Sequence, residues 1–456
     1  MISFQEALDA LGPVSEELYA TLDQEEEIVA LEWAVDRIAK HSYHSPRPTP
    51  AYDTSALDGF AIYSGMITHA SQKSPVTFCV DPNIVRPGGD CFVVSRGDIE
   101  ERCGCGNPGA VEIMTGGRFP SAVGSTKGAE LDCCIRREDT IEEEFPGGHR
   151  HIRIFNPVPS GKNMRLAASD FSKGDKILER GSVIRAKHIM ALASVGFHEV
   201  AVLPRLRVGI WSTGDELMRS STSECPDVNG PFLTSSLRSM GASVEFLGGI
   251  PDDSGSLTKE LKAAVASGQY HVLISTGGVS AGKYDFVHSS LESLNARNIF
   301  HHVAMEPGRP VLFATIPSGL QEEPSSVPAL PDIPFFGLPG NPIATTACFR
   351  FLVMPFLKPL LPTGPPPLSG HNLLDLMNSG NVEVICPPDS HQDLDVFRYG
   401  STVISRNGSK VKVLLNLDQS PGKVKPFTES TCWIHISRGG GSGGGGASGI
   451  KQAFPL

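Results

Sequence analysis

Three loops in this chain combine hydroxyl, carboxylate and glycine residues in a way that suits an anionic ligand. The first is Thr213-Gly214-Asp215-Glu216, which places one hydroxyl and two carboxylates directly after an apolar run. The second is Thr276-Gly277-Gly278-Val279-Ser280-Ala281-Gly282. Its glycines let backbone N–H groups approach a ligand, and its hydroxyls can donate to oxyanion oxygens. Because a helix pattern follows, the second loop is typical of a phosphate-binding loop.

The third loop is Gly337-Leu338-Pro339-Gly340-Asn341-Pro342. Its two prolines restrict the backbone and hold Asn341 rigidly, while Gly340 permits close approach of a ligand. Each of the three loops also has a plainer interpretation: acidic residues that favour a turn, a tight glycine turn, and a stiff entry to a helix. A fourth loop, Asp53-Thr54-Ser55-Ala56-Leu57-Asp58-Gly59, carries acceptors for a metal ion or water, although surface solvation explains its composition more simply.

Alternating strand and helix patterns between about 206 and 362 indicate how these loops are positioned. Apolar residues recur at helical spacing in three segments, and the proline at position 342 suits the first turn of a fourth helix. Short apolar runs predict strands, and they are Leu206–Trp211, Val244–Leu247, His271–Ser275, Val311–Thr315 and Phe335–Leu338. This alternation predicts a doubly wound, mostly parallel sheet, in which ligands bind at the carboxyl ends of the strands.

The flanking segments have a different character. Residues 50–160 contain short strand-like runs and many turns, which predicts a β-rich domain, and residues 366–438 predict a small all-β domain. The glycine run that starts at Gly439 cannot pack a core and predicts a flexible tail. At the other end, MISFQEALDALG has the pattern of a polar-faced helix. We therefore expect an α/β multidomain protein.

The 456 residues include 39 lysines and arginines against 50 aspartates and glutamates, which gives a net charge of −11. This balance argues against a general nucleic-acid surface, because neutralising phosphates requires a basic face. An anionic small molecule can still bind if a local loop supplies the positive potential. The sequence has no signal-peptide pattern and no uninterrupted apolar run long enough to span a bilayer, so we expect a cytoplasmic protein without membrane contact.

A cytoplasmic location predicts that the ten cysteines are mostly free thiols. Cys91, Cys103, Cys105 and the neighbouring pair Cys133 and Cys134 raise the alternative of a zinc site. The spacing Cys103-Gly-Cys105 is one residue tighter than the usual zinc knuckle, and no matching C-x-x-C occurs. Local spacing therefore disfavours zinc.

Six segments follow one another in a distinctive order along the chain. They are Asp53–Ala61, Ile113–Gly117, Ser212–Leu217, Gly277–Asp285, Glu306–Pro310 and Gly337–Pro342. This series resembles the molybdopterin molybdenumtransferase family, whose eukaryotic members include the E domain of gephyrin. The resemblance is strong from Phe4 to about Leu361 and weaker beyond.

The resemblance implies four domains and a tail, in which the β-rich domain is inserted between two passes of a linking domain. Members of the family are homodimers, and their active cleft combines the central domain of one subunit with the β-rich domain of the other. The implied divisions are 1–24 with 206–362 for the doubly wound molybdopterin-binding domain, 25–49 with 163–205 for the elongated linking domain, 50–162 for the β-rich domain, 366–438 for a C-terminal β-barrel, and 439–456 for the flexible tail.

The implied activity is insertion of molybdate into adenylylated molybdopterin with release of AMP, assisted by Mg²⁺, an ion that bridges phosphates with one or two carboxylates. The resemblance assigns Asp58, Glu216 and Asp285 as metal ligands, and these three together with Thr115 as the catalytic set. The residues implied to hold the pterin and its phosphate are Thr276, Gly277, Gly278, Ser280, Gly282, Asp252, Asp253, Pro307, Gly308, Arg309, Pro339, Gly340, Asn341 and Pro342.

Two positions depart from the family pattern: Glu306 stands where Lys is usual, and Ala344 stands where Ser is usual. A carboxylate near molybdate repels it, at a cost on the order of 1 to 4 kcal/mol. Lys283 stands where the family prefers Glu, so Glu306 and Lys283 could form a reversed ion pair. In that hypothesis Lys283, Arg309 or His302 supplies the missing positive charge.

These departures leave a second function open, namely a paralogue that binds a pterin or nucleotide phosphate without inserting metal. The intact Asp58, Thr115, Glu216, Asp285 and Asn341 favour the transferase. A third interpretation, a peptide-binding scaffold, is weaker because the chain lacks the partner domain and linker of the gephyrin fusion. The insertions at 90–108 and 317–334 could become ordered on binding in any of these cases.

Overall fold

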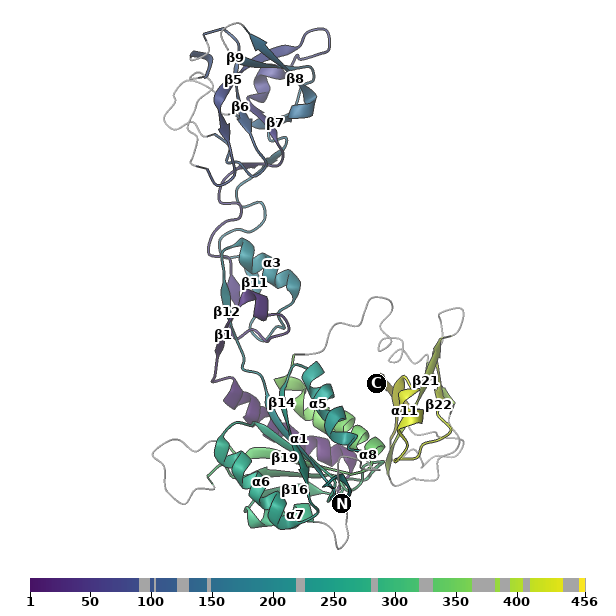
Figure 1. Ribbon diagram of the computed structural model, residues 1–456. Coiled ribbons are helices and arrows are strands. Elements are labelled where there is room, and N and C mark those ends of the chain that lie inside the picture. Colours follow the sequence, from purple (N-terminus) through teal and green to yellow (C-terminus); the bar gives the residue numbers. More distant parts are fainter. Residues whose placement is uncertain are drawn as a thin grey trace.

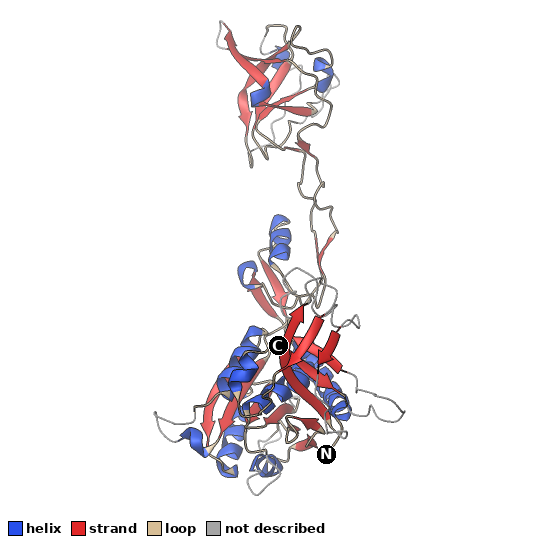
Figure 2. Ribbon diagram, turned by 90° about the vertical axis from the view of Figure 1, so that its right-hand side faces the viewer, coloured by secondary structure: helices blue, strands red, loops and turns tan. Residues whose placement is uncertain are grey.

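The structure is a computed structural model that describes residues 1–89, 99–101, 104–120, 131–145, 149–218, 226–279, 286–319, 331–362, 382–385, 394–404, 411–437 and 451–455. The chain is strongly elongated (Figure 1). A large base contains the N-terminal helix and the strand–helix alternation, and the C-terminal strands lie at its side. A narrow neck leads from the base to a separate β-rich domain at the far end, as the rotated view also shows (Figure 2).

The base is built on six strands: β13 (Arg207–Thr213), β14 (Ser243–Ile250), β15 (Val272–Thr276), β16 (Arg297–His301), β18 (Leu312–Ile316) and β19 (Ile333–Leu338). Their order is β14-β13-β15-β19-β18-β16, and the first four run parallel. β18 and β16 are antiparallel to their neighbours. The alternation in the sequence predicted every one of these strands except β16, which lacks an apolar run because it begins with Arg297 and Asn298.

Two hydrophobic cores lie on the two faces of this sheet. The larger core collects apolar residues of α1, α5, α8 and α9, and the smaller one those of α6 and α7. Figure 1 shows α6 and α7 on the opposite side of the sheet from α5 and α8. The helices are α1 (Phe4–Leu22), α4 (Asp215–Met218), α5 (Asn229–Ser239), α6 (Ser254–Ser267), α7 (Phe286–Ser293), α8 (Pro342–Cys348) and α9 (Met354–Leu357), with the π-helical turn η4 (Phe349–Val353) and the 3₁₀ turn η5 (Lys358–Leu360).

Local sequence explains where these helices begin and end. The hydroxyl of Ser3 accepts a hydrogen bond from the Glu6 N–H, and the Glu6 carboxylate accepts one from the Ser3 N–H, which forms a capping box before α1. Gly268 ends α6 in the left-handed conformation, at φ +62°. As predicted, Pro342 occupies the first turn of α8, directly after Asn341.

The neck consists of two chain segments that pass in opposite directions. Its strands pair antiparallel, β1 with β12 and β2 with β11, and a small core of leucine, valine and isoleucine side chains holds them together. Because the chain crosses the neck twice, both ends of the β-rich domain are attached to it. The elements are β1 (Glu27–Ala30), η1 (Leu31–Trp33), β2 (Tyr43–His44), β11 (Lys176–Leu178), α3 (Ala186–Ser194) and β12 (Glu199–Val202).

The β-rich domain is a six-stranded sheet with a hydrophobic core on each face. Side chains alternate across the sheet: in the strand Gly59–Ile62, Phe60 and Ile62 enter one core and Ala61 the other. The sheet order is β7-β4-β6-β5-β9-β8. The elements are β3 (Thr54–Ser55), β4 (Gly59–Ile62), η2 (Ser64–Ile67), β5 (Val76–Val85), β6 (Gly109–Ile113), β7 (Cys133–Arg136), η3 (Arg137–Asp139), β8 (Thr140–Phe145), β9 (His149–Ile154) and β10 (Met164–Arg165), of which β3 pairs with β10.

The C-terminal strands form a second sheet beside the base, in the order β20-β22-β21-β23-β24, and β17 of the base pairs with β21. Among the described strands this path is open, so closure into a β-barrel stays a prediction. The elements are β17 (Met305–Glu306), β20 (Val382–Ile385), β21 (Asp395–Ile404), β22 (Val411–Leu415), α11 (Val424–Thr428), β23 (Cys432–Ile436) and β24 (Lys451–Pro455).

The expectation of a flexible tail over 439–456 is wrong for Lys451–Pro455. This segment pairs antiparallel with β23, and the ring of Phe454 packs edge-on against Phe351 at a centroid distance of 5.4 Å. The glycine composition that predicted a tail ends before these residues. An aromatic side chain that packs against the base core and the pairing with β23 together hold this segment in place.

One helical segment in the described part of the chain, Pro342–Leu360, is long and apolar enough by composition to cross a bilayer. It is 72% buried inside the protein, and its residues belong to the larger core of the base. Arg350 and Lys358 interrupt this segment, so it is not the uninterrupted apolar run that a membrane span would need. Burial of this kind is what a core helix shows.

His271, just before β15, predicts a loss of stability in acid. Its Nδ1 accepts a hydrogen bond from the Arg207 N–H at 3.1 Å, and burial, followed by the charge of Arg207, lowers its pKa to about 4 from 6.5. The unfolded chain therefore takes up a proton at a higher pH than the folded chain. The stabilising contribution is complete above the unfolded pKa and is lost as the pH falls toward 4.

We expect the free energy of unfolding to fall by about 1 kcal/mol from this residue between about pH 7.5 and 5.5. Denaturant titrations of the wild type and of His271→Asn at the two pH values measure it, because asparagine can still accept the Arg207 N–H but does not titrate. An identical change in both proteins would show that His271 is not the group responsible.

Candidate active site

The predicted loops meet at one edge of the base sheet. Strand register places Ser212 beside Thr276 and Thr276 beside Leu338, so β13, β15 and β19 end at the same level. The chain passes from β13 to β14 on one side and continues to β15 on the other, which makes the β13–β15 boundary a topological switch point. Crevices for ligands form at such points, outside the carboxyl ends of the strands.

Direct contacts tie the first loop to the second. The Thr213 hydroxyl donates to the Thr276 carbonyl at 3.0 Å, and the Gly277 N–H donates to the Leu338 carbonyl at 2.9 Å. Thr213 and Thr276 are buried, at 6% and 2% exposure. The Thr213 hydroxyl and the Thr276 carbonyl therefore stabilise the loop conformation. The groups that contact a ligand must come from the residues that follow.

Gly277 and Gly278 can be nothing but glycine without a change in the loop. Their φ values are +93° and +68°, in the region that L side chains avoid. A Cβ on Gly277 would lie 2.5 Å from the Thr213 hydroxyl oxygen, and one on Gly278 would lie 2.4 Å from the Phe286 ring. The bare backbone is thus required by packing as well as by conformation.

Three carboxylates gather at the ends of β13 and β14. Asp215 accepts the Asp252 N–H at 3.1 Å, and the Glu216 carboxylate folds back over Gly214, where a Cβ would lie 2.5 Å from its oxygen. Burial raises the pKa of Asp252, a hydrogen bond from the Asp215 backbone to its carboxylate opposes this, and the charges of Glu216 and Asp215 raise it further. Like charges held together in this way favour a cation beside them.

The neighbouring Asp253 has a different environment. It is the N-cap of α6, and its carboxylate accepts the Ser256 N–H at 2.8 Å, which together with the Ser256 side chain lowers its pKa. The sequence analysis grouped it with Asp252 as a pterin-binding residue. The structure gives it a helix-capping contact, and nothing in the described residues adds a second one toward the loops.

A network that the sequence analysis missed joins the third loop to α5. The Asn229 side-chain amide donates to the Gly340 carbonyl at 2.8 Å, and Asp227 accepts the N–H groups of Asn229 and Gly230 at 3.0 and 3.1 Å. The Ser212 hydroxyl donates to the other oxygen of Asp227 at 2.7 Å. From the sequence, Asp227 and Asn229 indicate only the start of a helix. Their capping pattern was the available signal, but its link to Gly340 depends on tertiary contact.

The motif around Pro307 lies at the same edge of the sheet. β18 is antiparallel to β19, and Leu312 pairs with Gly337, so the residues just before β18 lie beside the end of β19. Gly308, at φ +116°, accepts a weak hydrogen bond from the Cys348 thiol at the end of α8. Arg309 is exposed. Four of the six ordered segments contribute residues to the base, and described residues of each lie at this edge.

Glu306 has an ion-pair partner that the sequence did not suggest. Its carboxylate lies 3.6 Å from the guanidinium of Arg398, on β21 of the C-terminal sheet. Arg398 is only 15% exposed in its side chain, against 38% for Glu306. The hypothesised partner Lys283 lies outside the described residues, as do Ser280, Gly282 and Asp285. Ala344 is buried in α8, at 5% exposure.

Asp58 and Thr115 lie in the β-rich domain, at the far end of the neck from Glu216 (Figure 1, Figure 2). Asp58 accepts hydrogen bonds from the Thr115 N–H at 2.6 Å and the Thr115 hydroxyl at 2.9 Å. These two bonds lower the pKa of Asp58, which is exposed. The pair is preorganised as an anion on the surface, and one chain alone does not bring it to the strand-end loops.

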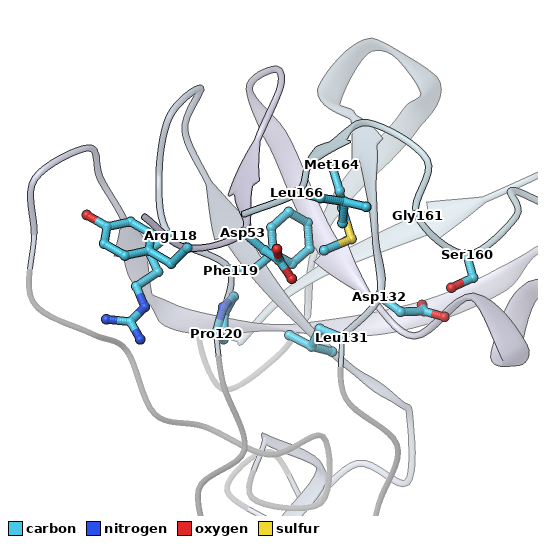
Figure 3. Close-up of a pocket in the computed structure, with 11 residues that line it drawn as sticks. Asp53, Arg118, Phe119, Pro120, Leu131, Asp132, Ser160, Gly161, Met164 and Leu166 are labelled. Carbon is cyan, nitrogen blue, oxygen red and sulfur yellow. The ribbon is translucent and has the colours of Figure 1, made fainter. Parts of the chain in front are cut away.

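A cavity of about 370 Å³ lies elsewhere in the β-rich domain (Figure 3). Asp53 and Phe119 point into its centre, with Leu131 and Met164 around them, and the Arg118 guanidinium stacks over the Tyr52 ring at 4.6 Å. Asp53 also accepts the Ala167 N–H at 2.8 Å. None of the lining residues belongs to the catalytic or pterin-binding sets, so this cavity does not mark the candidate active site.

The carboxylates suit a magnesium ion that is shared with a ligand phosphate. Among the described residues, no three acidic side chains bring donor oxygens within 4.8 Å of one another, so the described part of the base forms no closed cage of carboxylates. Mg²⁺ usually keeps several waters and binds one or two carboxylates together with substrate phosphates. The exposed Glu216 and the repelled Asp252 fit that pattern, beside a loop built to approach phosphate.

Comparison with known proteins matches this architecture on both sides of the neck. Residues 2–196 match the family described as "MoeA N-terminal region (domain I and II)", and residues 209–359 match the family described as "Probable molybdopterin binding domain". A crystal structure of a molybdopterin biosynthesis MoeA protein from Pyrococcus horikoshii is similar, with a TM-score of 0.61 and 20% identity over 99% of each chain. At that identity it supports the fold alone.

Curated relatives extend the comparison to sequence. A molybdopterin molybdenumtransferase from Synechococcus elongatus is 31% identical over 413 residues, which cover 89% of this chain and 88% of the relative. One from Nostoc sp. is 30% identical over 342 residues, 74% of this chain and 70% of the relative. The chain therefore belongs to the molybdopterin molybdenumtransferase family and is an enzyme of molybdenum cofactor biosynthesis.

Proposed function

We propose that this enzyme inserts molybdate into adenylylated molybdopterin and releases AMP, in the cytoplasm. The observation that carries the proposal is the convergence, at one switch point, of a side-chain-free glycine loop and three carboxylates. The glycine loop accommodates the terminal phosphate of the pterin through backbone N–H groups. The glycine loop follows β15, whereas the carboxylates follow β13 and β14, one and two strands from β15 in the sheet. In this proposal the phosphoanhydride is cleaved beside these carboxylates.

Glu216 and Asp252 would hold the Mg²⁺ that the family implies, and the ion would stabilise the charge that develops as the phosphoanhydride breaks. The chain's own residues supply the positioning. The hydrogen bond from Asn229 to the Gly340 carbonyl holds the third loop against α5. The hydrogen bond from the Thr213 hydroxyl to the Thr276 carbonyl holds the first loop against the second. The loops therefore keep their relative positions when substrate binds. Such fixed positioning is a main source of rate enhancement in transfer reactions.

The proposal includes a homodimer in which the β-rich domain of one copy covers the base of the other. Asp58 and Thr115 form a hydrogen-bonded, exposed pair in the β-rich domain at one end of the elongated chain, while Glu216 belongs to the base at the other end. Two copies placed head to base would close both sites at once, which is the closed symmetry that most soluble oligomers adopt.

Incubation of the purified protein with adenylylated molybdopterin, molybdate and Mg²⁺ tests the function. We expect AMP release that requires molybdate, and a product that restores activity to a cofactor-free molybdoenzyme. Molybdate-independent AMP release, or binding of the pterin without any turnover, would contradict the proposal.

The second of these outcomes is the one expected of a paralogue that binds a pterin phosphate without inserting metal. Glu306 and Ala344 favour that alternative, because one brings a negative charge and the other removes a hydroxyl where an oxyanion is expected. The negative charge of Glu306 is a weaker argument for that alternative than it first appears from the sequence. The ion pair with Arg398 compensates this charge and brings a guanidinium to the same place. We therefore propose the transferase.

Glu306→Lys, which restores the residue usual in the family, is expected to lower the free energy of unfolding. The new ammonium would face Arg398 across about the distance now spanned by an ion pair of 3.6 Å. Repulsion between two like charges at that separation costs on the order of 1 to 4 kcal/mol. Denaturant unfolding of the variant and of the wild type measures the loss.

Glu306→Gln serves as the matched control for this substitution. It removes the ion pair without adding repulsion, and we expect a smaller loss of stability. Equal stability of Glu306→Lys and the wild type would contradict the assignment of Arg398 as the ion-pair partner of Glu306.

A further inference from the structure

The β-rich domain brings three metal-binding side chains together at a place unrelated to the active site. The sulfur atoms of Cys79 and Cys105 and a ring nitrogen of His151 all lie within 4.8 Å of one another. Cys79 lies on β5, His151 on β9 and Cys105 in the turn before β6, at the end of the molecule remote from the base (Figure 1). Side chains from three separate elements thus converge on one point.

Strand register explains the convergence. Cys79 and His151 are directly opposite each other in the antiparallel pair of β5 and β9, so their side chains leave the same face of the sheet. Both are buried, at 2% and 3% exposure. Cys105 comes over them from a turn flanked by Gly104 and Gly106, which have φ values of +60° and +74°.

Distances within the cluster match those of a tetrahedral zinc site. The Nε2 atom of His151 lies 3.5 Å from the Cys105 sulfur. Zinc bonds of about 2.3 Å to sulfur and about 2.0–2.1 Å to nitrogen, at a tetrahedral angle, place those two atoms roughly 3.6 Å apart. The separation is therefore the one that a shared ion would require.

Groups around the cluster prepare its atoms for a metal. The Nδ1 atom of His151 lies 3.2 Å from the His149 carbonyl, an arrangement that puts the ring proton on Nδ1 and leaves the Nε2 lone pair facing Cys105. The Asn107 side-chain amide donates to the Cys105 sulfur at 3.5 Å, which orients that sulfur within the cluster. Such outer partners are typical of ligating histidines and thiolates.

Cys79 takes part in a disulfide in this structure, whereas Cys105 keeps its thiol. The disulfide and a metal–thiolate bond at Cys79 exclude each other. We propose that, once the Cys79 disulfide is reduced, Cys79, Cys105 and His151 bind one zinc ion, which fastens the turn before β6 to the β5–β9 pair. Two thiolates and an imidazole select zinc over Mg²⁺ or Ca²⁺, and these three described ligands leave one tetrahedral position for a further ligand.

The reaction balances with a phosphine as reductant. The phosphine takes up the oxygen of one water molecule and becomes a phosphine oxide, and the disulfide gains two electrons and two protons to give two thiols. Zinc then displaces the protons of the Cys79 and Cys105 thiols as it binds. The inference does not depend on molybdate insertion, since it concerns a different domain face and is read out by metal binding.

Titration of the phosphine-treated full-length protein with Co²⁺, followed by Zn²⁺, tests the site. We expect one Co²⁺ per chain with the thiolate charge-transfer and d–d absorption of a tetrahedral sulfur site, its displacement by Zn²⁺, and no such absorption before reduction. Cys105→Ser is exposed and should fold, and we expect its metal dissociation constant to rise about a hundredfold or more. Asn107→Ala, which removes only the outer hydrogen bond, should raise it about tenfold or more.

His149→Ala is the matched control, because its ring is exposed and its backbone carbonyl, the partner of His151, is retained. It should bind cobalt like the wild type. Absence of the tetrahedral spectrum after complete reduction, or equal affinity of Cys105→Ser and the wild type with unchanged circular dichroism, would overturn the proposal.

Discussion

Co-expression of Asp58→Ala and Glu216→Ala chains is expected to restore about a quarter of wild-type activity, although each variant alone loses about a hundredfold or more. Removal of a single electrostatic group from an active site typically costs that much. In a mixed dimer one site contains both substitutions and the other contains neither. With random pairing half of the dimers are mixed, and each carries one intact site of two. AMP release by the whole co-expressed mixture, purified through a tag common to both chains, measures the recovery.

The matched control combines Asp58→Ala with Thr115→Ala. Both residues lie in the same domain and bond to each other, so every site of the mixed dimer keeps one substitution and no activity should return. All three positions are exposed, which limits effects on folding. Failure of the first mixture to recover activity, in a dimer shown to contain both chains, would rule out a site shared between subunits.

Gly278→Ala is expected to weaken pterin binding about a hundredfold, because a misplacement of about 1 Å in a positioning loop can cost that much. A left-handed conformation costs a non-glycine residue about 1–2 kcal/mol, and overpacking against Phe286 adds about 1–3 kcal/mol. We therefore expect the free energy of unfolding to fall by about 2–5 kcal/mol. Fluorescence titration with the pterin and denaturant unfolding measure the two effects.

Gly268→Ala separates conformational strain from the clash. Gly268 has nearly the same φ, +62°, at the end of α6, but a Cβ there meets no atom within 4 Å. We expect this control to lose about 1–2 kcal/mol of stability and to bind the pterin normally. Equal pterin affinity in Gly278→Ala and Gly268→Ala would show that the loop does not approach the ligand.

Properties that depend on neighbouring residues in the sequence could be predicted well. The alternation of apolar runs and helical spacing located β13, β14, β15, β18 and β19. All of these except β14 are buried along almost their whole length, and such a strand leaves a continuous apolar run. The loops between them followed from glycine and proline positions. β16 was missed for the same physical reason, since a polar edge strand leaves no such run.

Pairings between distant residues could not be predicted in this way. The ion pair of Glu306 with Arg398 joins the base to the C-terminal sheet, and no pattern near Glu306 specifies that partner. The hypothesis of Lys283 as its partner relied on sequence proximity to the motif. Asn229 is a similar case, because its contact with Gly340 spans 111 residues.

The cysteines show the same limit more sharply. Local spacing argued against zinc because it considered Cys103 and Cys105 together. The cluster instead uses Cys79, Cys105 and His151, which become neighbours only through the pairing of β5 with β9. Cys79 also departs from the expectation of mostly free thiols, whereas the other five described cysteines agree with it.

The position of α1 has a consequence for synthesis on the ribosome. The Ser15 hydroxyl donates to the Phe356 carbonyl, 341 residues later in the chain, and the apolar side of α1 shares its core with η4 and α9. At about 5–20 residues per second, that partner emerges roughly 20–70 s after Ser15. During this interval Phe4, Leu11 and Leu18 have no native neighbours from the last helices, so the nascent chain should need a holding chaperone while the β-rich domain folds ahead of it.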